Sequence, residues 1–227
     1  MQGIARFCHS QNILDNPNEA RLRYCLCLTA MQNQKIYKNT KLKNSMLGRI
    51  VFDSILKKAF ERKNPIVIGL CGTVNSGKHV LASRIAADFA KKEIKNIKAS
   101  PQRDTKLKHD FTLSSKNGNL KLSITDISEN PNSKEIIETI RWFDDADVVT
   151  ILMDAEKEPY SQINTVLINS LMAKDIPVIL AYSKIDLKKI DIKNIAVHYN
   201  RCPIVGISAQ YGKNLKNYYE NMLKLIG

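Results

Sequence analysis

The sequence lacks a hydrophobic run long enough to cross a membrane. Its longest apolar stretches, such as VVTILM at residues 148–153, fall far short of the roughly 18 residues that a spanning helix needs. The N-terminal region also lacks the continuous apolar core of a signal peptide, because Arg21 and Arg23 interrupt the stretch RLRYCLCLTA. We therefore expect no membrane span and a cytoplasmic location.

The cysteines lack the paired two-residue spacing of zinc and redox motifs. They are odd in number and scattered along the chain: Cys8, Cys25, Cys27, Cys71 and Cys202. This spacing is typical of reduced thiols and argues against a disulfide framework.

Acidic residues are scarce relative to basic ones. The chain has 35 Lys and Arg against 22 Asp and Glu, a formal net charge of +13. Residues 1–64 hold 12 basic and 4 acidic residues, so most of the excess lies there. Such an excess suggests an acidic partner, and we expect rRNA or the ribosome. A general lysine bias of the proteome would produce the same composition.

Two regions follow from the hydrophobic pattern. From residue 65 onward, strand and helix patterns alternate, whereas residues 1–64 do not share that rhythm. Within this basic N-terminal extension, apolar residues recur with helical spacing over about 46–62, while residues 1–44 are polar and without a period. The predicted organisation is a partly disordered extension, 1–64, and one domain, 65–227.

The domain pattern predicts an α/β fold. Strands are expected at 65–72, 147–155, 177–186 and 203–209, and a hairpin is expected around Asn117-Gly118 within 110–127. Helices are expected at 79–94, 133–145, 161–175, 192–199 and 213–227. Alternation of this kind predicts a mostly parallel sheet with one antiparallel hairpin, covered by helices on both faces.

One expected helix gives a test of the periodicity. The segment SKEIIETIRWFDD is predicted to begin at Ser133, which would serve as its cap. Its apolar positions Ile136, Ile137, Ile140 and Phe143 are predicted to face inward.

The stretch GTVNSGKHVL, residues 72–81, has the spacing of a phosphate-binding loop. A glycine, four residues, then glycine and lysine lie between a buried strand and a helix, which is the context that such a loop requires. Glycines let successive N–H groups point at phosphates, and the helix adds its positive N-terminal end. The predicted phosphate-binding residues are Gly72, Asn75, Ser76, Gly77, Lys78 and His79.

Three further elements follow predicted strands in a consistent order. Asp126 ends the strand in SITDISEN, where nucleotide hydrolases place an aspartate that holds magnesium. The segment SKID, with Ser183, Lys184 and Asp186, is typical of a guanine reader, because the carboxylate accepts two N–H groups of the base. SAQ follows the next strand, where a backbone N–H would meet the guanine oxygen. Its residues are Ser208, Ala209 and Gln210.

With these four elements in order, the chain resembles the P-loop GTPases over about residues 65–227. GTVNSGKHVL is similar to the phosphate loop of translation initiation and elongation factors, and residues 154–187 resemble the family stretch in which a glutamine, here Gln162, opens a helix. Era-like ribosome-assembly GTPases share much of this layout. The resemblance implies a three-layer G domain, GTP or GDP as ligand, and Mg²⁺ as cofactor.

The departures from the family pattern concern magnesium and catalysis. His79 replaces the hydroxyl that holds Mg²⁺, a metal that prefers hard oxygen ligands. Asp126 is followed by ISEN instead of the glycine that senses the third phosphate and the histidine that positions water. The family implies a second magnesium ligand besides Asp126, a threonine of the switch segment. Thr105 matches this threonine by its spacing to Asp126, whereas Ser100 matches it by its spacing to Lys78. Ser183 stands where the family has asparagine.

The resulting expectation is a translation-factor-like protein that binds guanine nucleotides and hydrolyses GTP weakly or not at all. Two alternatives stay open. The stretch NSGKHVLASRIAADF would fit a P-loop small-molecule kinase, although no cluster of lid arginines follows the core strands. A non-catalytic RNA- or ribosome-binding module would fit the basic extension and the missing catalytic groups.

Other residues carry simpler interpretations. His109 and His198 have no partner at ligand spacing in the sequence, and we interpret both as isolated surface groups. Trp142, Tyr218 and Tyr219 occupy helical positions, where packing is the expected role.

Overall fold

A computed structural model describes residues 57, 60–61, 65–90, 97–100, 108–115 and 118–226. The described residues of the predicted 46–62 helix, Lys57, Phe60 and Glu61, are helical. The rest of that helix and most of the extension lie outside the described residues. The division of the chain at residue 64 therefore stays a prediction.

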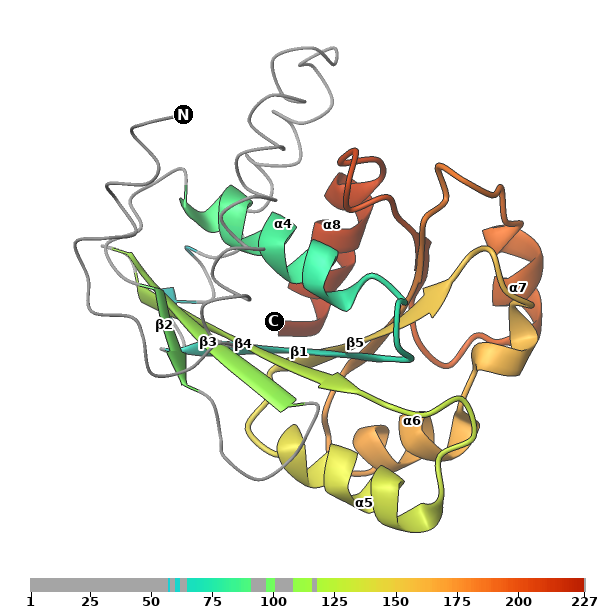
Figure 1. The fold of residues 1–227 in the computed structure, drawn as a ribbon, viewed down its shortest axis with the longest axis horizontal. Helices are drawn as coiled ribbons and strands as arrows, with labels where there is room; N and C mark the ends of the chain where they lie inside the picture. Colours follow the sequence, from blue (N-terminus) through green and yellow to red (C-terminus); the bar gives the residue numbers. More distant parts are fainter. Residues whose placement is uncertain are drawn as a thin grey trace, which may run out of the picture.

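The described part is built on one seven-stranded sheet (Figure 1). The strands are β1 (Ile66–Gly72), β2 (Ile97–Ser100), β3 (Lys108–Ser115), β4 (Gly118–Asp126), β5 (Val148–Asp154), β6 (Val178–Ser183) and β7 (Ile204–Gly206). Their order is β2-β3-β4-β1-β5-β6-β7. Pairs β2/β3 and β3/β4 are antiparallel and all others are parallel. The predicted hairpin is confirmed as β3–β4, whereas the edge strand β2 was not predicted.

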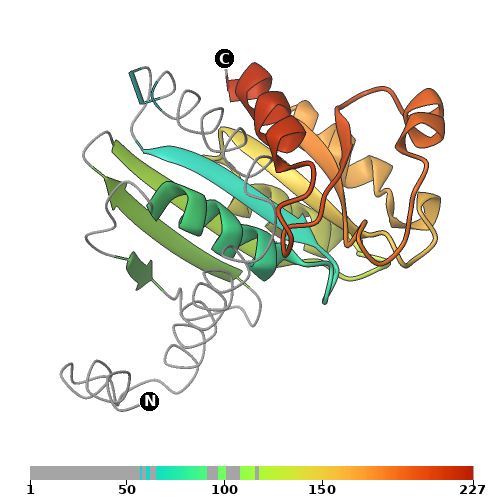
Figure 2. The same ribbon diagram turned by 90° about the horizontal axis from the view of Figure 1, so that it is seen from above.

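Helices cover both faces of the sheet, which confirms the three-layer α/β fold (Figures 1 and 2). Helices α4 (Lys78–Ala90) and α8 (Leu215–Ile226) pack on one face, and α5 (Ser133–Trp142), α6 (Thr165–Met172) and α7 (Ile192–His198) on the other. A short 3-10 helix, η1 (Tyr160–Gln162), precedes α6.

The central strands β1, β5 and β6 supply side chains to two separate cores, because successive side chains point to opposite faces of a sheet. In β1, Ile66, Ile68 and Leu70 belong to the core under α4 and α8, and Cys71 belongs to the core under α5 and α6. All seven β1 residues are buried, as expected for a central parallel strand. The continuous apolar run PIVIGLCG follows from burial on both faces.

The aromatic residues of α8 serve packing, as predicted. Tyr218 and Tyr219 are fully buried, and the hydroxyl of Tyr219 donates to Asp88 Oδ2 at 2.8 Å. The hydroxyls of Tyr218 and Thr150 lie 2.9 Å apart. These bonds satisfy the polar ends of rings that are otherwise enclosed by apolar side chains.

One predicted helix and one predicted helix cap were wrong. The helix predicted over 161–175 is divided into η1 and α6, because the Asn164 side chain accepts from Leu167 N–H and caps a new helix there. Helix α5 begins at Ser133 as predicted, but its cap is Asn132, whose side chain accepts from Glu135 N–H at 2.9 Å. Both caps are asparagines, which compete with serine for this position.

The predicted inward face of α5 is confirmed at three of its four positions. Ile136 and Ile140 are each 8% exposed and Phe143 is fully buried, but Ile137 is 49% exposed. A helix turns by 100° per residue, so adjacent isoleucines point in different directions and only one of them meets the sheet.

Within the described residues, no helix is both long and apolar enough to cross a lipid bilayer.

This face gives a stability prediction. Ile136→Ala is expected to lower the free energy of unfolding by about 2–5 kcal/mol, because it leaves a cavity against the sheet. Its neighbour provides the matched control, since Ile137→Ala removes the same atoms from an exposed position and is expected to cost about 0.5 kcal/mol or less. Urea denaturation of both variants measures the difference. Equal losses would contradict the observed orientation of α5.

Candidate functional site

The four sequence elements meet at one edge of the sheet. The parallel strands β1, β4, β5, β6 and β7 all end at this edge, which is where open α/β sheets bind ligands. The register places Gly72 beside Asp126 across β1/β4, and Asp154 beside Ser183 across β5/β6. Residues far apart in the sequence therefore become neighbours.

The loop between β1 and α4 has the backbone shape that its glycines allow. Gly77 has φ of 93° and Asn75 has φ of 65°, both in the left-handed region. A Cβ on Gly72 would lie 2.3 Å from the Leu152 carbonyl oxygen, so no other residue fits there. The loop closes on itself through Ser76 N–H, which donates to the Thr73 carbonyl oxygen at 3.1 Å.

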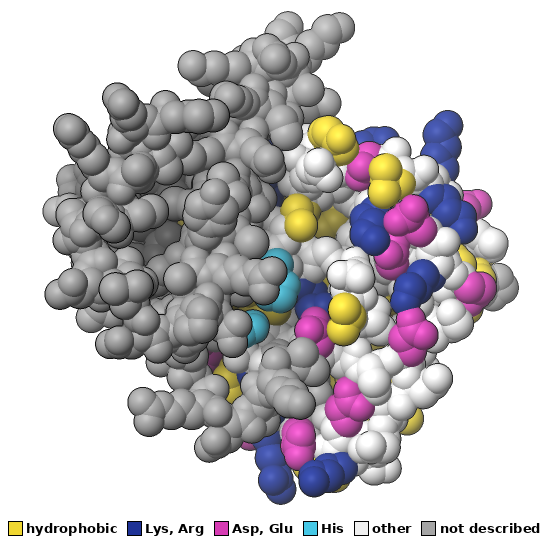
Figure 3. All heavy atoms as spheres, viewed as in Figure 1, with side chains coloured by type: hydrophobic (Ala, Val, Ile, Leu, Met, Phe, Trp, Pro, Cys, Tyr) yellow, Lys and Arg dark blue, Asp and Glu magenta, His cyan; other side chains and the backbone are white. Residues whose placement is uncertain are grey.

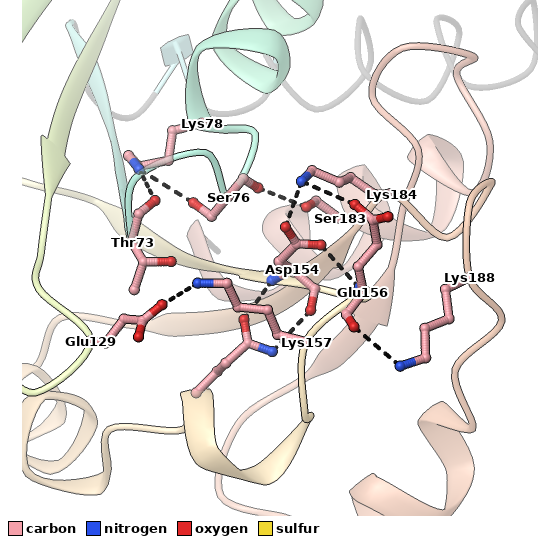
Figure 4. A network of polar contacts seen from close by, with 11 residues as sticks. Thr73, Ser76, Lys78, Glu129, Asp154, Glu156, Lys157, Ser183, Lys184 and Lys188 are labelled. Carbon is pink, nitrogen blue, oxygen red and sulfur yellow. Dashed lines mark hydrogen bonds and ion pairs between the residues drawn. The ribbon is translucent and has the colours of Figure 1, made fainter.

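Lys78 lies inside this loop, and its side chain is only 2% exposed. Its ammonium group donates to the Thr73 carbonyl oxygen at 2.6 Å and to Ser76 Oγ at 3.3 Å (Figure 4). It also pairs with Asp126 Oδ1 at 2.5 Å. These partners hold a buried cation within reach of any anion in the loop. The prediction that Lys78 and Asp126 share one site is consistent with this contact.

Ser183 connects the loop to the predicted base-reading segment. Its hydroxyl is buried and donates to the Ser76 carbonyl oxygen at 2.7 Å (Figure 4). A Cβ on Gly77 would lie 3.4 Å from the same hydroxyl, so the two segments are in close contact. Ser183, at the position where the resemblance implies asparagine, thus supports the loop between β1 and α4 through this hydrogen bond.

Lys184 is held by acidic residues that were not among the site residues predicted from the sequence. Its ammonium group pairs with Asp154 Oδ2 at 2.5 Å and with Glu156 Oε2 at 3.4 Å (Figure 4). The Asp154 hydrogen bond is the main reason that the pKa of Lys184 is raised. Asp154 ends β5 next to the end of β6, and this strand-end position was the signal that could have identified it.

Gln162 fixes the segment that follows Asp154. Its side-chain oxygen accepts from Asp154 N–H at 2.7 Å, and its amide nitrogen donates to the Asp154 and Glu158 carbonyl oxygens at 2.9 and 3.0 Å. These three bonds fold the chain back over the end of β5. Gln162 is therefore a structural residue of the site.

The remaining predicted base-reading residues differ in exposure. Asp186 lies in the turn after β6 and is exposed. Ser208 is buried, its N–H and carbonyl bond to Lys213, and its Oγ accepts from Tyr211 N–H at 3.3 Å. Ala209 is buried and Gln210 is exposed in the same turn. This turn follows β7, and the two strands β5 and β6 lie between β7 and β1, which leads into the predicted phosphate loop.

A pocket of about 180 Å³ lies beside the loop, on the face that carries α5 and α6. The segment after Asp126 forms one wall of it, with Ser128, Glu129 and Asn130. The Glu129 carboxylate pairs with the Lys157 ammonium group across this pocket (Figure 4). The negative charge expected from Glu129 is therefore compensated within the site.

His79 and His109 are neighbours, so the interpretation of His109 as an isolated group was wrong. Their ring centroids lie 5.8 Å apart at an interplanar angle of 65°. Partial burial, followed by the charge of His109, lowers the pKa of His79. This contact could not be predicted from local sequence patterns, because it depends on the packing of α4 against β3, which is itself positioned by its pairing with β4.

The resemblance implied Mg²⁺ as cofactor, but the side chains at this site do not suit this metal. Asp126 offers oxygen but is bound to Lys78, and His79 offers nitrogen, which Mg²⁺ disfavours. Thr105 lies outside the described residues, and Ser100 is in β2, paired with Asp110. In the described part of the chain, no three His, Cys, Asp or Glu side chains are grouped to hold a metal ion.

Cys71 lies at the end of β1, directly below the loop. It is a free thiol, and burial raises its pKa to about 12. It is therefore protonated and unreactive, as the sequence interpretation of reduced thiols predicts for this residue.

Comparison with known proteins gives structural matches only. No protein-family model and no curated protein sequence matches the chain. The G domain of the T. maritima FeoB iron transporter matches with a TM-score of 0.50 and 22% identity over 71% of this chain and 99% of that one. The ADP-ribosylation-factor-like GTP-binding protein SAR1 from Encephalitozoon cuniculi, in complex with GDP, matches at 0.53 and 16% over 95% and 96%.

Aquifex aeolicus Era, bound to GDP and AlF4⁻, matches with a TM-score of 0.48 and 20% identity over 70% of this chain and 56% of that one. All three identities are below 25%, so these likenesses concern the fold.

The contact below the loop gives the prediction for this site. Ser183→Ala is expected to lower the free energy of unfolding by about 1–3 kcal/mol, because it leaves the buried Ser76 carbonyl oxygen without this donor. Ser161→Ala removes a similar hydroxyl bond, to the Glu158 carbonyl oxygen at 3.0 Å, from an exposed position and should be nearly neutral. Urea denaturation compares them. A neutral Ser183→Ala would show that the loop does not depend on β6.

Proposed function

Since the chain has the G-domain fold of the P-loop GTPases, we propose that it binds GTP and GDP and hydrolyses GTP weakly or not at all. The observation that carries this proposal is the Ser183 bridge at 2.7 Å from the predicted base-reading segment to the predicted phosphate loop. A nucleotide needs both parts of its site at a fixed separation, and this bond holds them together.

The phosphates would lie on the loop 72–78. Its backbone N–H groups and the N-terminus of α4 provide partial positive charge, and Lys78 provides a full one. Because Lys78 is already buried against Asp126, a bound phosphate would replace or share a partner that is present. Lys78 is thus desolvated when the protein folds, and binding of a phosphate adds little further desolvation of this cation.

The base would lie between Lys184 and the turn that contains Asp186. The Asp186 carboxylate is exposed and free to accept the two N–H groups that guanine presents on one edge, which adenine lacks. Asp154 and Glu156 hold the Lys184 ammonium group, so its aliphatic stem can cover one face of the base. Ser208, Ala209 and Gln210 would close the other side.

Weak hydrolysis is expected because the segment after Asp126, which would lie near the third phosphate, lacks the groups that sense this phosphate and position water. The residue after Asp126 is Ile127, whose N–H donates to the Gly72 carbonyl oxygen at 3.0 Å and is not directed at a ligand. Ser128 and Glu129 follow without a glycine or a histidine. No residue of this segment is a candidate to orient water in the way that the translation-factor histidine does.

The translation-factor-like character is part of the same proposal. It is supported by the similarity of residues 72–81 and by Gln162, which bonds to both backbone groups of Asp154. This bonding pattern gives the family-like stretch a structural purpose at the end of β5.

The test of the proposal is calorimetric titration with GDP, GTP and ATP, with and without magnesium. GDP and GTP are expected to bind roughly 10²-fold or more tightly than ATP, because adenine would leave Asp186 unpaired. GTP recovered after incubation is expected to be largely intact. Equal affinity for ATP, or no binding at all, would refute the proposal.

A specificity variant sharpens this test. Asp186→Asn is expected to weaken GDP binding and to favour xanthosine diphosphate, because an amide can accept from N1–H and donate to the second oxygen of xanthine. Asp175→Asn alters an exposed aspartate in the turn after α6 and should leave both affinities unchanged. If both variants behave alike, Asp186 does not read the base.

We also propose rRNA as a partner, on the basis of the charge of +13 and its concentration in residues 1–64. Binding of an rRNA fragment to the full chain should weaken by about 10³-fold between 50 and 200 mM salt if six phosphates are contacted. Four lysines of the extension and four exposed lysines of the domain form matched sets for replacement by glutamine. They are Lys35, Lys38, Lys41 and Lys43 against Lys134, Lys189, Lys193 and Lys224.

The extension set should reduce RNA affinity much more than the domain set, as measured by filter binding at 100 mM salt. A larger loss from the domain set, or affinity that does not depend on salt, would contradict an RNA role for the extension.

A further inference from the structure

The second residue of α4 and a residue of β3 bring two imidazole rings together next to the phosphate loop. His79 follows the loop lysine directly, and His109 lies opposite Ile124 on the neighbouring strand β4. Their centroids are 5.8 Å apart. In Figure 3 the histidine side chains visible on this face lie together, close to basic and acidic side chains.

The spacing of the rings suits a shared metal ion. Two imidazoles bound to one tetrahedral ion, each with a metal–nitrogen distance of 2.0–2.1 Å, have their centroids about 5 Å apart. A separation of 5.8 Å reaches this value with a small rotation of either ring. The ring planes are inclined to each other at 65°, so the two rings are not stacked.

The position of His109 is fixed by its surroundings. Its strand is paired with β4 along its whole length, and its ring also contacts Phe111, with centroids 6.4 Å apart. His79 is fixed by the start of α4, where Leu81 N–H donates to the Gly77 carbonyl oxygen at 2.9 Å. Two rigid elements therefore hold these rings next to each other.

We propose that His79 and His109 bind a borderline transition-metal ion, of the Zn²⁺ or Co²⁺ class, that takes the place of Mg²⁺ against the nucleotide phosphates. This inference rests on the proposed function for the phosphate ligands, while the two protein ligands are independent of it. Imidazole nitrogen suits these ions and is a poor donor for Mg²⁺.

The number of protein ligands is sufficient for a metal of this kind. Zn²⁺ takes four ligands in a tetrahedral arrangement, so two histidines would leave two positions for phosphate oxygens or water. Within the described residues, no third His, Cys, Asp or Glu is grouped with them to hold a metal ion. Asp126 stays with Lys78, so the ion and the ammonium group would approach the phosphates from different sides.

The first experiment titrates the nucleotide-free full chain with Co²⁺ and records its absorption spectrum and the heat of binding. One tight site is expected, with a spectrum that lacks thiolate-to-cobalt charge transfer. His79→Gln and His109→Gln should each weaken it by more than the roughly 10–100-fold that loss of an outer-shell partner costs. His198→Gln, in α7, is the matched control and should retain the site.

Circular dichroism of each variant shows whether it is folded, so that loss of metal can be assigned to loss of a ligand. Binding that survives in the double variant of His79 and His109, or a spectrum dominated by thiolate, would overturn the inference. So would tighter binding of Mg²⁺ than of Co²⁺ or Zn²⁺.

The second experiment measures GDP affinity in EDTA, in Mg²⁺ and in Zn²⁺. Zn²⁺ is expected to increase GDP affinity at least tenfold more than Mg²⁺ does, and His79→Ser, which restores a hydroxyl, should reverse this order. GDP binding without a preference for Zn²⁺ refutes the metal inference alone. Co²⁺ bound at the histidines with no GDP binding in any condition refutes the nucleotide proposal alone.

Discussion

The parallel register of β1 with β4 and β5, and of β5 with β6, is the constraint on which the site depends. It places Gly72 beside Asp126 and Asp154 beside Ser183, although these residues are 54 and 29 positions apart in the chain. A slip of one residue would turn Asp154 and Ser183 to opposite faces and would remove the support of the loop. Because β1 is buried on both faces, such a slip is strongly disfavoured.

Around that register, the site balances its own charges. Lys78 is paired with Asp126, Lys184 with Asp154 and Lys157 with Glu129. Lys78 is the buried member of the three, and a buried cation without a partner would be costly, so its pair with Asp126 stabilises the folded loop. Lys184 and Lys157 are more exposed, and the Lys157 pair offsets the negative charge of Glu129 beside this loop.

The part of the candidate site that the sequence could predict has local signals. The predicted phosphate loop is defined by the spacing of Gly72, Gly77 and Lys78, and the left-handed backbone at positions 75 and 77 suits the asparagine and the glycine found there. The position of His109 was not predictable, since its contact with His79 depends on the pairing of two strands. The strand-end position of Asp154 could be read from the sequence, but its pairing with Lys184, which follows the neighbouring strand β6, could not.

The sequence by itself determined the layer architecture and the order of the motifs, because hydrophobic period, glycine spacing and strand-end position are properties of short segments. Only the tertiary structure decided which side chains meet. The addition of β2, the exposure of Ile137, the Ser183 bridge and the two facing histidines all follow from strand pairing and helix orientation. These are set by the burial of both faces of the sheet together, which no single segment encodes.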